Sequence, residues 1–183
     1  MDRTTIFAAV IAAFVVGAAV LYRSDVMSGD AAQLSTPDNS NYYMDDATVY
    51  QLNKQGDLAY RLKAKRSLHF PDDSSRFTDI AVHYLSGTDT YWDLTADKGR
   101  IPAGKRDLYI YDGVTGDHPN DNGTVVHVTT DHAWVRPDAD RIDSDAPVKA
   151  VQPGQTLEGN GLRINLKTNK LDILHDVHVI YTQ

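Results

Sequence analysis

The chain has 183 residues, of which 18 are basic and 25 are acidic, so its formal net charge is −7. This charge argues against a nucleic-acid-binding protein, because such proteins gain affinity from Lys and Arg side chains that neutralise phosphates. The sequence contains no cysteine, which excludes disulfides and thiolate metal sites.

The N-terminal segment differs in composition from the rest of the chain. Residues 6–22 carry no charge and lie between Arg3 and Arg23. A helix over residues 4–22 would span roughly 28 Å, close to the hydrocarbon thickness of a bilayer. We therefore predict an uncleaved transmembrane anchor over residues 1–23, with the C-terminal part outside the cytoplasm. The alternative is a cleaved signal peptide, whose apolar region would be unusually long. A polar linker, residues 24–40, separates the anchor from a domain over residues 41–183.

The domain shows the two-residue period of β-strands. Leu58, Tyr60, Leu62 and Ala64 alternate with polar or small residues, as expected of a strand with one apolar face. Similar stretches follow and are separated by turn sequences rich in Pro, Gly, Asn and Asp. The predicted strand pairs are 92–97 with 108–114, 125–135 with 142–148, and 162–166 with 171–181. Because no stretch has a convincing helical period, we predict an all-β fold, a curved antiparallel array.

A short segment that begins with aspartate recurs four times at a spacing near 33 residues. Such a period indicates a repeated unit that stacks on its neighbours. The copies begin at Asp79, Asp112, Asp145 and Asp176, and we interpret these aspartates as turn or strand-exit residues. A small residue precedes each copy: Ala64, Ala96, Thr130 and Gly159. These small residues either keep the interior open or lie where strands cross closely at a bend.

Catalytic and metal-binding patterns find little support in the sequence. His175 and His178 would point to opposite faces of a strand and so could not share a metal ion without a bend. The adjacent pairs Asp117-His118 and Asp131-His132 have no nucleophile motif beside them. We predict that the protein is not an enzyme and has neither a cofactor nor a metal site.

Several short motifs, taken in order, carry a resemblance to a known family. They are Val49-Tyr50, Gly56-x-Leu58-x-Tyr60-Arg61-Leu62-x-Ala64, Trp92-x-Leu94-x-Ala96-Asp97, Leu108-Tyr109-Ile110-Tyr111 and Thr129-Thr130-Asp131. With the anchor and linker, they resemble the LptC family of the lipopolysaccharide export bridge in Gram-negative bacteria. The resemblance implies a twisted, open β-jellyroll like that of LptA, lying in the periplasm on a single-pass inner-membrane anchor. It also implies that the domain receives lipopolysaccharide from the LptB, LptF and LptG ABC transporter and passes it to LptA.

A carrier of acyl chains needs an apolar interior, since each buried methylene contributes about 0.8 kcal/mol. We expect this interior to be incompletely filled. Alternation assigns the inward residues, including Leu68 and Trp134, and the resemblance favours those near the open ends of the groove. The predicted lipid-binding residues of the lumen are Phe77, Leu171, Tyr181, Tyr60, Leu62, Trp92, Leu94, Ile173 and Val179.

The last predicted strand is apolar on both faces near its end and has no Pro or Lys after Lys170. Edge strands are normally protected by such residues, so this edge is suited to strand addition from a partner. The alternative is that the strand pairs only within the domain. The resemblance implies LptA at this edge and the transporter at the N-terminal edge, residues 42–52. The predicted partner-binding residues are Val177, His178, Val179, Ile180 and Tyr181.

Gly154 lies in a Gln-Pro-Gly-Gln turn that calls for a positive φ, and the resemblance implies that a glycine here matters for assembly. The alternative function is a membrane-anchored structural or adhesion module, built of β-repeats, that binds only protein.

Overall fold

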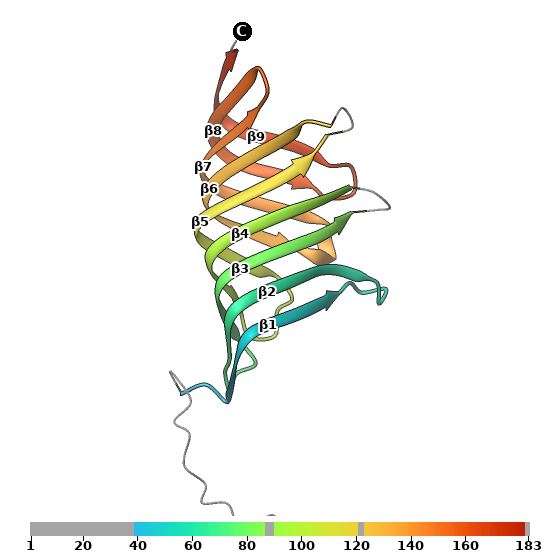
Figure 1. The fold of residues 1–183 in the computed structure, drawn as a ribbon, viewed down its shortest axis with the longest axis vertical. Coiled ribbons are helices and arrows are strands. Elements are labelled where there is room, and N and C mark those ends of the chain that lie inside the picture. The colour runs from blue at the N-terminus through green and yellow to red at the C-terminus, as the bar shows by residue number, and fades with distance from the viewer. Residues whose placement is uncertain (1–38, 87–89, 121–122, 182–183) are drawn as a thin grey trace, which may run out of the picture. The chain divides into compact units, whose positions relative to one another are not determined.

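The computed structural model describes residues 39–86, 90–120 and 123–181. Within these residues the chain forms nine strands and a short 3₁₀ turn, Pro137–Ala139. The strands are β1 (Tyr42–Leu52), β2 (Leu58–His69), β3 (Ser75–Ser86), β4 (Thr90–Ile101), β5 (Leu108–Pro119), β6 (Val125–Arg136), β7 (Arg141–Gln152), β8 (Gln155–Asn165) and β9 (Lys170–Tyr181). They form one antiparallel sheet in chain order (Figure 1). The predicted all-β fold is therefore confirmed.

The predicted anchor lies outside the described residues, as does the linker up to residue 38. Among the residues that are described, no helix is long and apolar enough to cross a membrane.

A line of irregular pairing crosses the sheet near the middle of its strands. Asp46, Asp79, Asp112 and Asp176 lie on this line, and their φ values are +53°, +49°, +63° and +51°. Residues on either side of the line pair regularly, whereas those on it are skipped or shifted in register. Such β-bulges bend a strand, and aspartate is one of the few non-glycine residues that tolerates positive φ.

The bulges fold the sheet over on itself, so that each strand contributes to two limbs (Figure 1). The first limb consists of residues 47–52, 58–64, 80–86, 90–96, 114–119, 125–130, 148–152, 155–159 and 177–181. The second limb consists of residues 42–45, 66–69, 75–78, 98–101, 108–111, 132–136, 141–144, 162–165 and 170–174.

The interpretation of the repeated aspartates as turn or strand-exit residues is wrong. The aspartates that begin the four copies all lie inside strands: Asp79, Asp112, Asp145 and Asp176. The repeat therefore follows the bend of the sheet and not its hairpin turns. The small residues lie beside the same line, which favours the explanation by close packing at the bend. At Gly159 a β-carbon would lie 2.6 Å from Ile173 Cγ2 and 2.7 Å from the His175 carbonyl oxygen, so a larger residue does not fit without a shift of the backbone.

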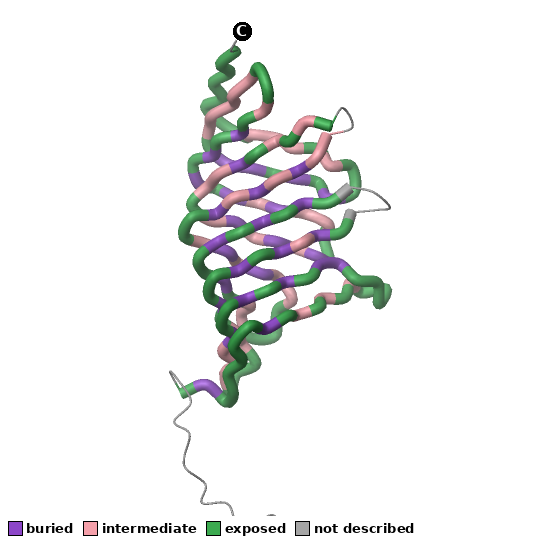
Figure 2. Tube along the Cα trace, in the orientation of Figure 1, coloured by how far each residue is buried: buried purple, intermediate pink, exposed green. Residues whose placement is uncertain are grey.

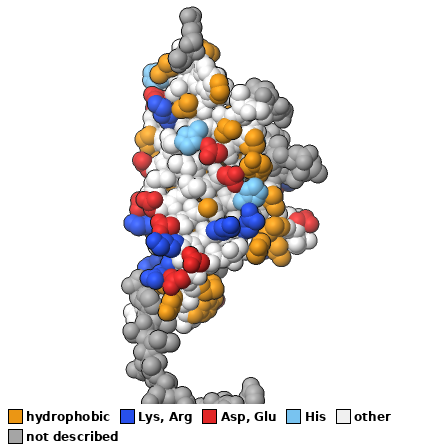
Figure 3. All heavy atoms as spheres, viewed as in Figure 1, with side chains coloured by type: hydrophobic (Ala, Val, Ile, Leu, Met, Phe, Trp, Pro, Cys, Tyr) orange, Lys and Arg blue, Asp and Glu red, His pale blue; other side chains and the backbone are white. Residues whose placement is uncertain are grey.

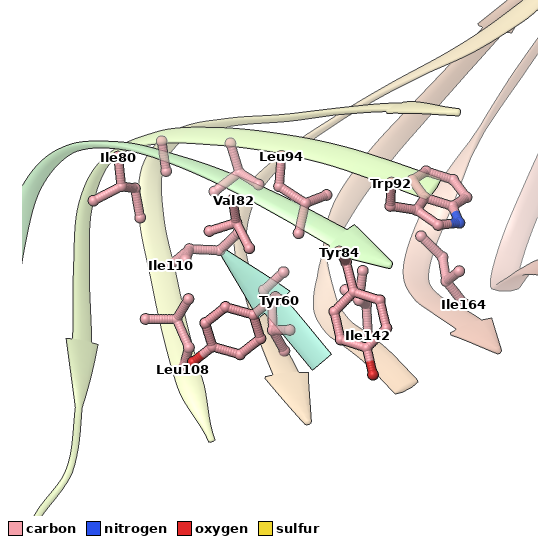
Figure 4. Packing of buried hydrophobic residues seen from close by; sticks show 14 of the residues in the cluster. Tyr60, Ile80, Val82, Tyr84, Trp92, Leu94, Leu108, Ile110, Ile142 and Ile164 are labelled. Atoms are coloured by element: carbon pink, nitrogen blue, oxygen red, sulfur yellow. The ribbon is translucent and has the colours of Figure 1, made fainter. Parts of the chain in front are cut away.

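The inner faces of the two limbs pack directly against each other. Trp92 and Leu94 of the first limb line one small cavity together with Ile110, Ile142 and Ile164 of the second. Figure 4 shows these side chains pointing toward one another between the ribbons. The buried cluster extends from β2 to β8, whereas β1 and β9 are mostly exposed (Figure 2). The core therefore ends before the two edges of the sheet.

Two residues predicted to face inward lie on the outer face instead. Trp134 contacts the ring of Tyr109 and the guanidinium of Arg136, while its neighbours Ala133 and Val135 are buried. Leu68 follows the buried Ser67 and is the register partner of Arg76 on β3. The line of irregular pairing explains both errors, because the buried face changes phase there. Ala64 and then Ser67 are buried on β2, and Val128 and then Ala133 and Val135 are buried on β6.

Candidate functional site

The space between the limbs is lined by most of the predicted lumen residues. Tyr60, Leu62, Phe77, Trp92 and Leu94 are all buried, with no more than 4% of any of them exposed. The cavity between the limbs that Trp92, Leu94 and Ile110 line has a volume of only ≈20 Å³. This is room for about one water molecule. The expectation of an incompletely filled interior is thus wrong for this conformation, and an acyl chain could lie here only if the limbs separated.

The other predicted lumen residues lie on β9, where the core comes to an end. Leu171 and Ile173 are partly buried against the central cluster. Val179 and Tyr181 belong to the same strand but are 43% and 76% exposed. Val179 is the register partner of Leu157, which packs against the core. The apolar inner surface therefore extends onto β9, where it is exposed.

Two polar atoms inside the core have no hydrogen-bond partner among the described residues, namely Tyr60 Oη and Trp92 Nε1. Burial raises the pKa of Tyr60, so its hydroxyl remains protonated and can donate. Leaving such a group unsatisfied costs about 1–3 kcal/mol. Each of these donors would be satisfied by an acceptor atom that comes to lie beside it. A buried Trp side chain usually donates its N–H to an acceptor. That Trp92 has no such acceptor could not be predicted from the sequence.

Polar contacts join the rims of the two limbs beside β1. Arg106, in the turn between β4 and β5, donates a hydrogen bond to the Leu52 carbonyl oxygen, and its Nε lies 3.5 Å from Asp138 Oδ1. On the other side of the same carboxylate, Lys54 Nζ lies 3.8 Å from Asp138 Oδ2. These residues, called the rim contacts below, are partly exposed, and exposed ion pairs contribute only about 0–1 kcal/mol each. They join the rims of the two limbs by weak contacts between partly exposed groups.

Both end strands of the sheet have a neighbouring strand on one side only, within the described part of the chain. Apolar side chains are exposed at each of these edges. On β1 they are Tyr42, Tyr43, Met44, Tyr50 and Leu52, and on β9 they are Leu174, Val177, Val179, Ile180 and Tyr181. The predicted partner-binding residues thus lie together on an exposed edge strand. The aromatic character of the β1 edge was not singled out from the sequence, although Tyr42, Tyr43 and Tyr50 signal it.

Histidines and aspartates form cross-strand pairs on the outer face. These are not the adjacent pairs Asp117-His118 and Asp131-His132 noted in the sequence. The His132 ring bonds to Asp145 at 2.5 Å, and this hydrogen bond holds the pKa of Asp145 below its usual range. The other pairs, each at 2.6 Å, are His83 with Asp93 and His127 with Asp117. No cluster of His, Asp or Glu within the described residues is arranged to hold a metal ion. These pairs are thus best explained as support for the sheet surface.

The outer surface carries both charged and apolar side chains. Figure 3 shows side chains of both charges spread over one outer face. A hollow of ≈450 Å³ follows the bend, with Thr115, Thr129 and Lys149 in its lining. Val114, Pro147 and Val148 line the same hollow beside Asp131, Lys149 and Glu158, so its lining is mixed. The space between the limbs is lined mostly by apolar side chains and is the better candidate for apolar ligands. Gly154, in the turn between β7 and β8, has φ +79°.

The family model described as "Lipopolysaccharide-assembly, LptC-related" matches residues 8–182 of this chain. A similar solved structure is that of LptH, described as the LptA homologous periplasmic component of the conserved lipopolysaccharide transport device from Pseudomonas aeruginosa. It shares 12% identity with a TM-score of 0.53, over 68% of this chain and 95% of LptH, which establishes a common fold. The curated proteins include no significant match.

Proposed function

The chain belongs to the LptC-related lipopolysaccharide-assembly family, and on this basis we propose that its β-domain receives lipopolysaccharide from an LptB, LptF and LptG transporter and passes it to LptA. The observation that carries the proposal is the continuous apolar surface between the limbs, with two unsatisfied donors inside it. We further propose that residues 1–23 anchor the chain in the inner membrane and that the domain lies in the periplasm. No chemical transformation is part of this role.

The energetics of such a carrier follow from its closed conformation. An acyl chain of a dozen carbons gains on the order of 10 kcal/mol when it leaves water. Separating the limbs exposes Trp92, Leu94 and their partners, but the incoming chain covers the same surfaces again. Binding is therefore an exchange of one set of apolar contacts for another. Such an exchange keeps the lipid soluble without holding it too tightly for release.

The two sheet edges give the transfer a direction. We propose that β1, which follows the linker, receives strands or loops of the transporter, and that β9 accepts a strand of LptA. Strand addition satisfies the free backbone groups of an edge, while exposed apolar side chains such as Ile180 and Tyr181 add contact area. The groove would then continue from one protein into the next.

Native mass spectrometry of the full-length protein, purified from membranes in a mild detergent, tests this function. We expect an adduct with the mass of lipopolysaccharide, which added lipopolysaccharide increases. A protein-binding structural module is the alternative, favoured only by the exposed apolar edges. Capture of LptA or of the transporter without any lipid adduct, even after lipopolysaccharide is added, would support that alternative and exclude a carrier.

A further inference from the structure

We propose that Arg76 and Arg100 form a binding site for a phosphate group carried by the glycolipid. The two residues are register partners on β3 and β4, so their side chains leave the same face of the sheet side by side. Both side chains are exposed. Like charges placed directly opposite each other destabilise a sheet. The Arg76 guanidinium leans toward Phe70, in the turn after β2, and that of Arg100 leans toward Tyr109 on β5, so each can donate to a different oxygen of the anionic part of one ligand.

Most cations on this surface already have a carboxylate partner. Lys98, two residues before Arg100, lies 2.9 Å from Asp112, and Arg136 lies 2.9 Å from Asp107. Arg76 and Arg100 have no ion-pair partner among the described residues. Their charge thus remains available to a ligand.

Aromatic rings hold both guanidinium groups in place. The Arg76 guanidinium lies 4.7 Å from the ring centroid of Phe70, and that of Arg100 lies 4.9 Å from the ring of Tyr109. A guanidinium stacked on a ring keeps the N–H groups at its edge free, and these match phosphate oxygens in pairs. The rings therefore order the two side chains without using the donors that a phosphate needs.

The position of the pair relates it to the groove between the limbs, and this step rests on the proposed function. Arg76 is the second residue of β3, and the next residue, Phe77, faces the interior and is 3% exposed. Phe77 pairs in register with Gly99, and Arg76 with Arg100. Both pairs lie close to the rim of the second limb, where β3 begins and β4 ends. A ligand that extends over this rim can place an acyl chain beside Phe77 and a phosphate on the arginines. A phosphate on the saccharide of lipopolysaccharide has this chemistry.

The test compares the double variant Arg76→Gln/Arg100→Gln with Arg61→Gln/Lys63→Gln in the full-length protein. The control removes the same charge, since Arg61 and Lys63 are also exposed cations without an ion-pair partner among the described residues. It does so away from the proposed site, on β2 in the first limb. Binding is measured by native mass spectrometry with lipopolysaccharide, with the same lipid after removal of its phosphates, and with inorganic phosphate as competitor. The melting temperature of each variant is measured without ligand.

We expect the Arg76/Arg100 variant to bind phosphorylated lipopolysaccharide at least about tenfold more weakly, since charge-assisted hydrogen bonds are lost. Its affinity for the dephosphorylated lipid should match that of the wild type, and the control should bind both lipids normally. Its melting temperature should be unchanged or higher, because a like-charge contact is removed. Competition by millimolar inorganic phosphate would identify the site as one for free phosphate as well.

Equal losses for both lipid forms, or an equal loss in the control variant, would overturn the phosphate site. So would wild-type binding that does not depend on the phosphates. In each of these cases the carrier function stands, because lipid is still bound. Failure of the wild type to bind either form of the lipid would instead refute the proposed function on which the site rests.

Discussion

A covalent link between the rims of the two limbs is expected to abolish uptake of lipopolysaccharide. Lys54 and Asp138 meet at the rim contacts, 3.8 Å apart, and lie on opposite sides of the groove opening. Because the cavity inside measures only ≈20 Å³, lipid can be accommodated only if this opening widens. The variant Lys54→Cys/Asp138→Cys, joined by a short bis-maleimide, should show no lipid adduct in native mass spectrometry. The chain has no other cysteine, so the linkage is unambiguous.

The matched control for this experiment places the same link within one limb. Thr95 and Thr115 are register partners on β4 and β5, and their hydroxyl oxygens lie 2.8 Å apart on the exposed side. A linked Thr95→Cys/Thr115→Cys variant should bind lipopolysaccharide as the wild type does, since the two limbs remain free to part. Normal lipid binding by the protein linked at the rim would show that the limbs need not separate.

Deletion of residues 174–183 is expected to abolish capture of LptA while the shortened protein stays in the membrane fraction. The deletion removes the exposed end of β9, including Val177, Ile180 and Tyr181, which we propose as the receiving edge. Most buried side chains lie on β2 to β8, so the core is retained. The measurement is co-purification of LptA with the tagged protein. An unchanged yield of LptA would exclude β9 as the docking strand.

A pair of point variants separates loss of docking from loss of folding. Ile180→Lys places a charge on the exposed edge, where lysine opposes strand addition, and should weaken LptA capture strongly. Val151→Lys places the same charge on β7, which has neighbours on both sides, and should leave capture unchanged. Equal effects of the two substitutions would point to a general electrostatic effect instead of edge recognition.

Local patterns in the sequence predicted most of the strands, although 108–114 and 162–166 cover only parts of β5 and β8. Alternation at Tyr60 and Leu62, and again at Trp92 and Leu94, reflects one buried and one exposed face, and all four side chains are buried as predicted. The same reasoning failed for Trp134, because it lies beyond the line of irregular pairing, where the inward phase changes. A bulge depends on how neighbouring strands pair, and a single strand's pattern does not record this.

The candidate site was less accessible to sequence reasoning than the fold. Alternation identifies the inward side chains but not the distance between the limbs, so the nearly filled interior was unexpected. The rim contacts join Lys54 to Asp138, and the phosphate site pairs Arg76 with Arg100 across two strands. Both depend on register and on the fold of the sheet over itself. They became visible only once the positions of the strands were known.

Site-specific photo-crosslinking is the most direct test of whether lipopolysaccharide lies between the limbs. A photo-reactive phenylalanine analogue at Phe77, inside the groove, is compared with one at Thr95, whose side chain faces outward. In membranes that contain the transporter, we expect a lipopolysaccharide adduct at Phe77 that depends on ATP, and none at Thr95. The absence of an adduct at Phe77 and at the other inward positions Leu62 and Leu94, while transport continues, would contradict the account.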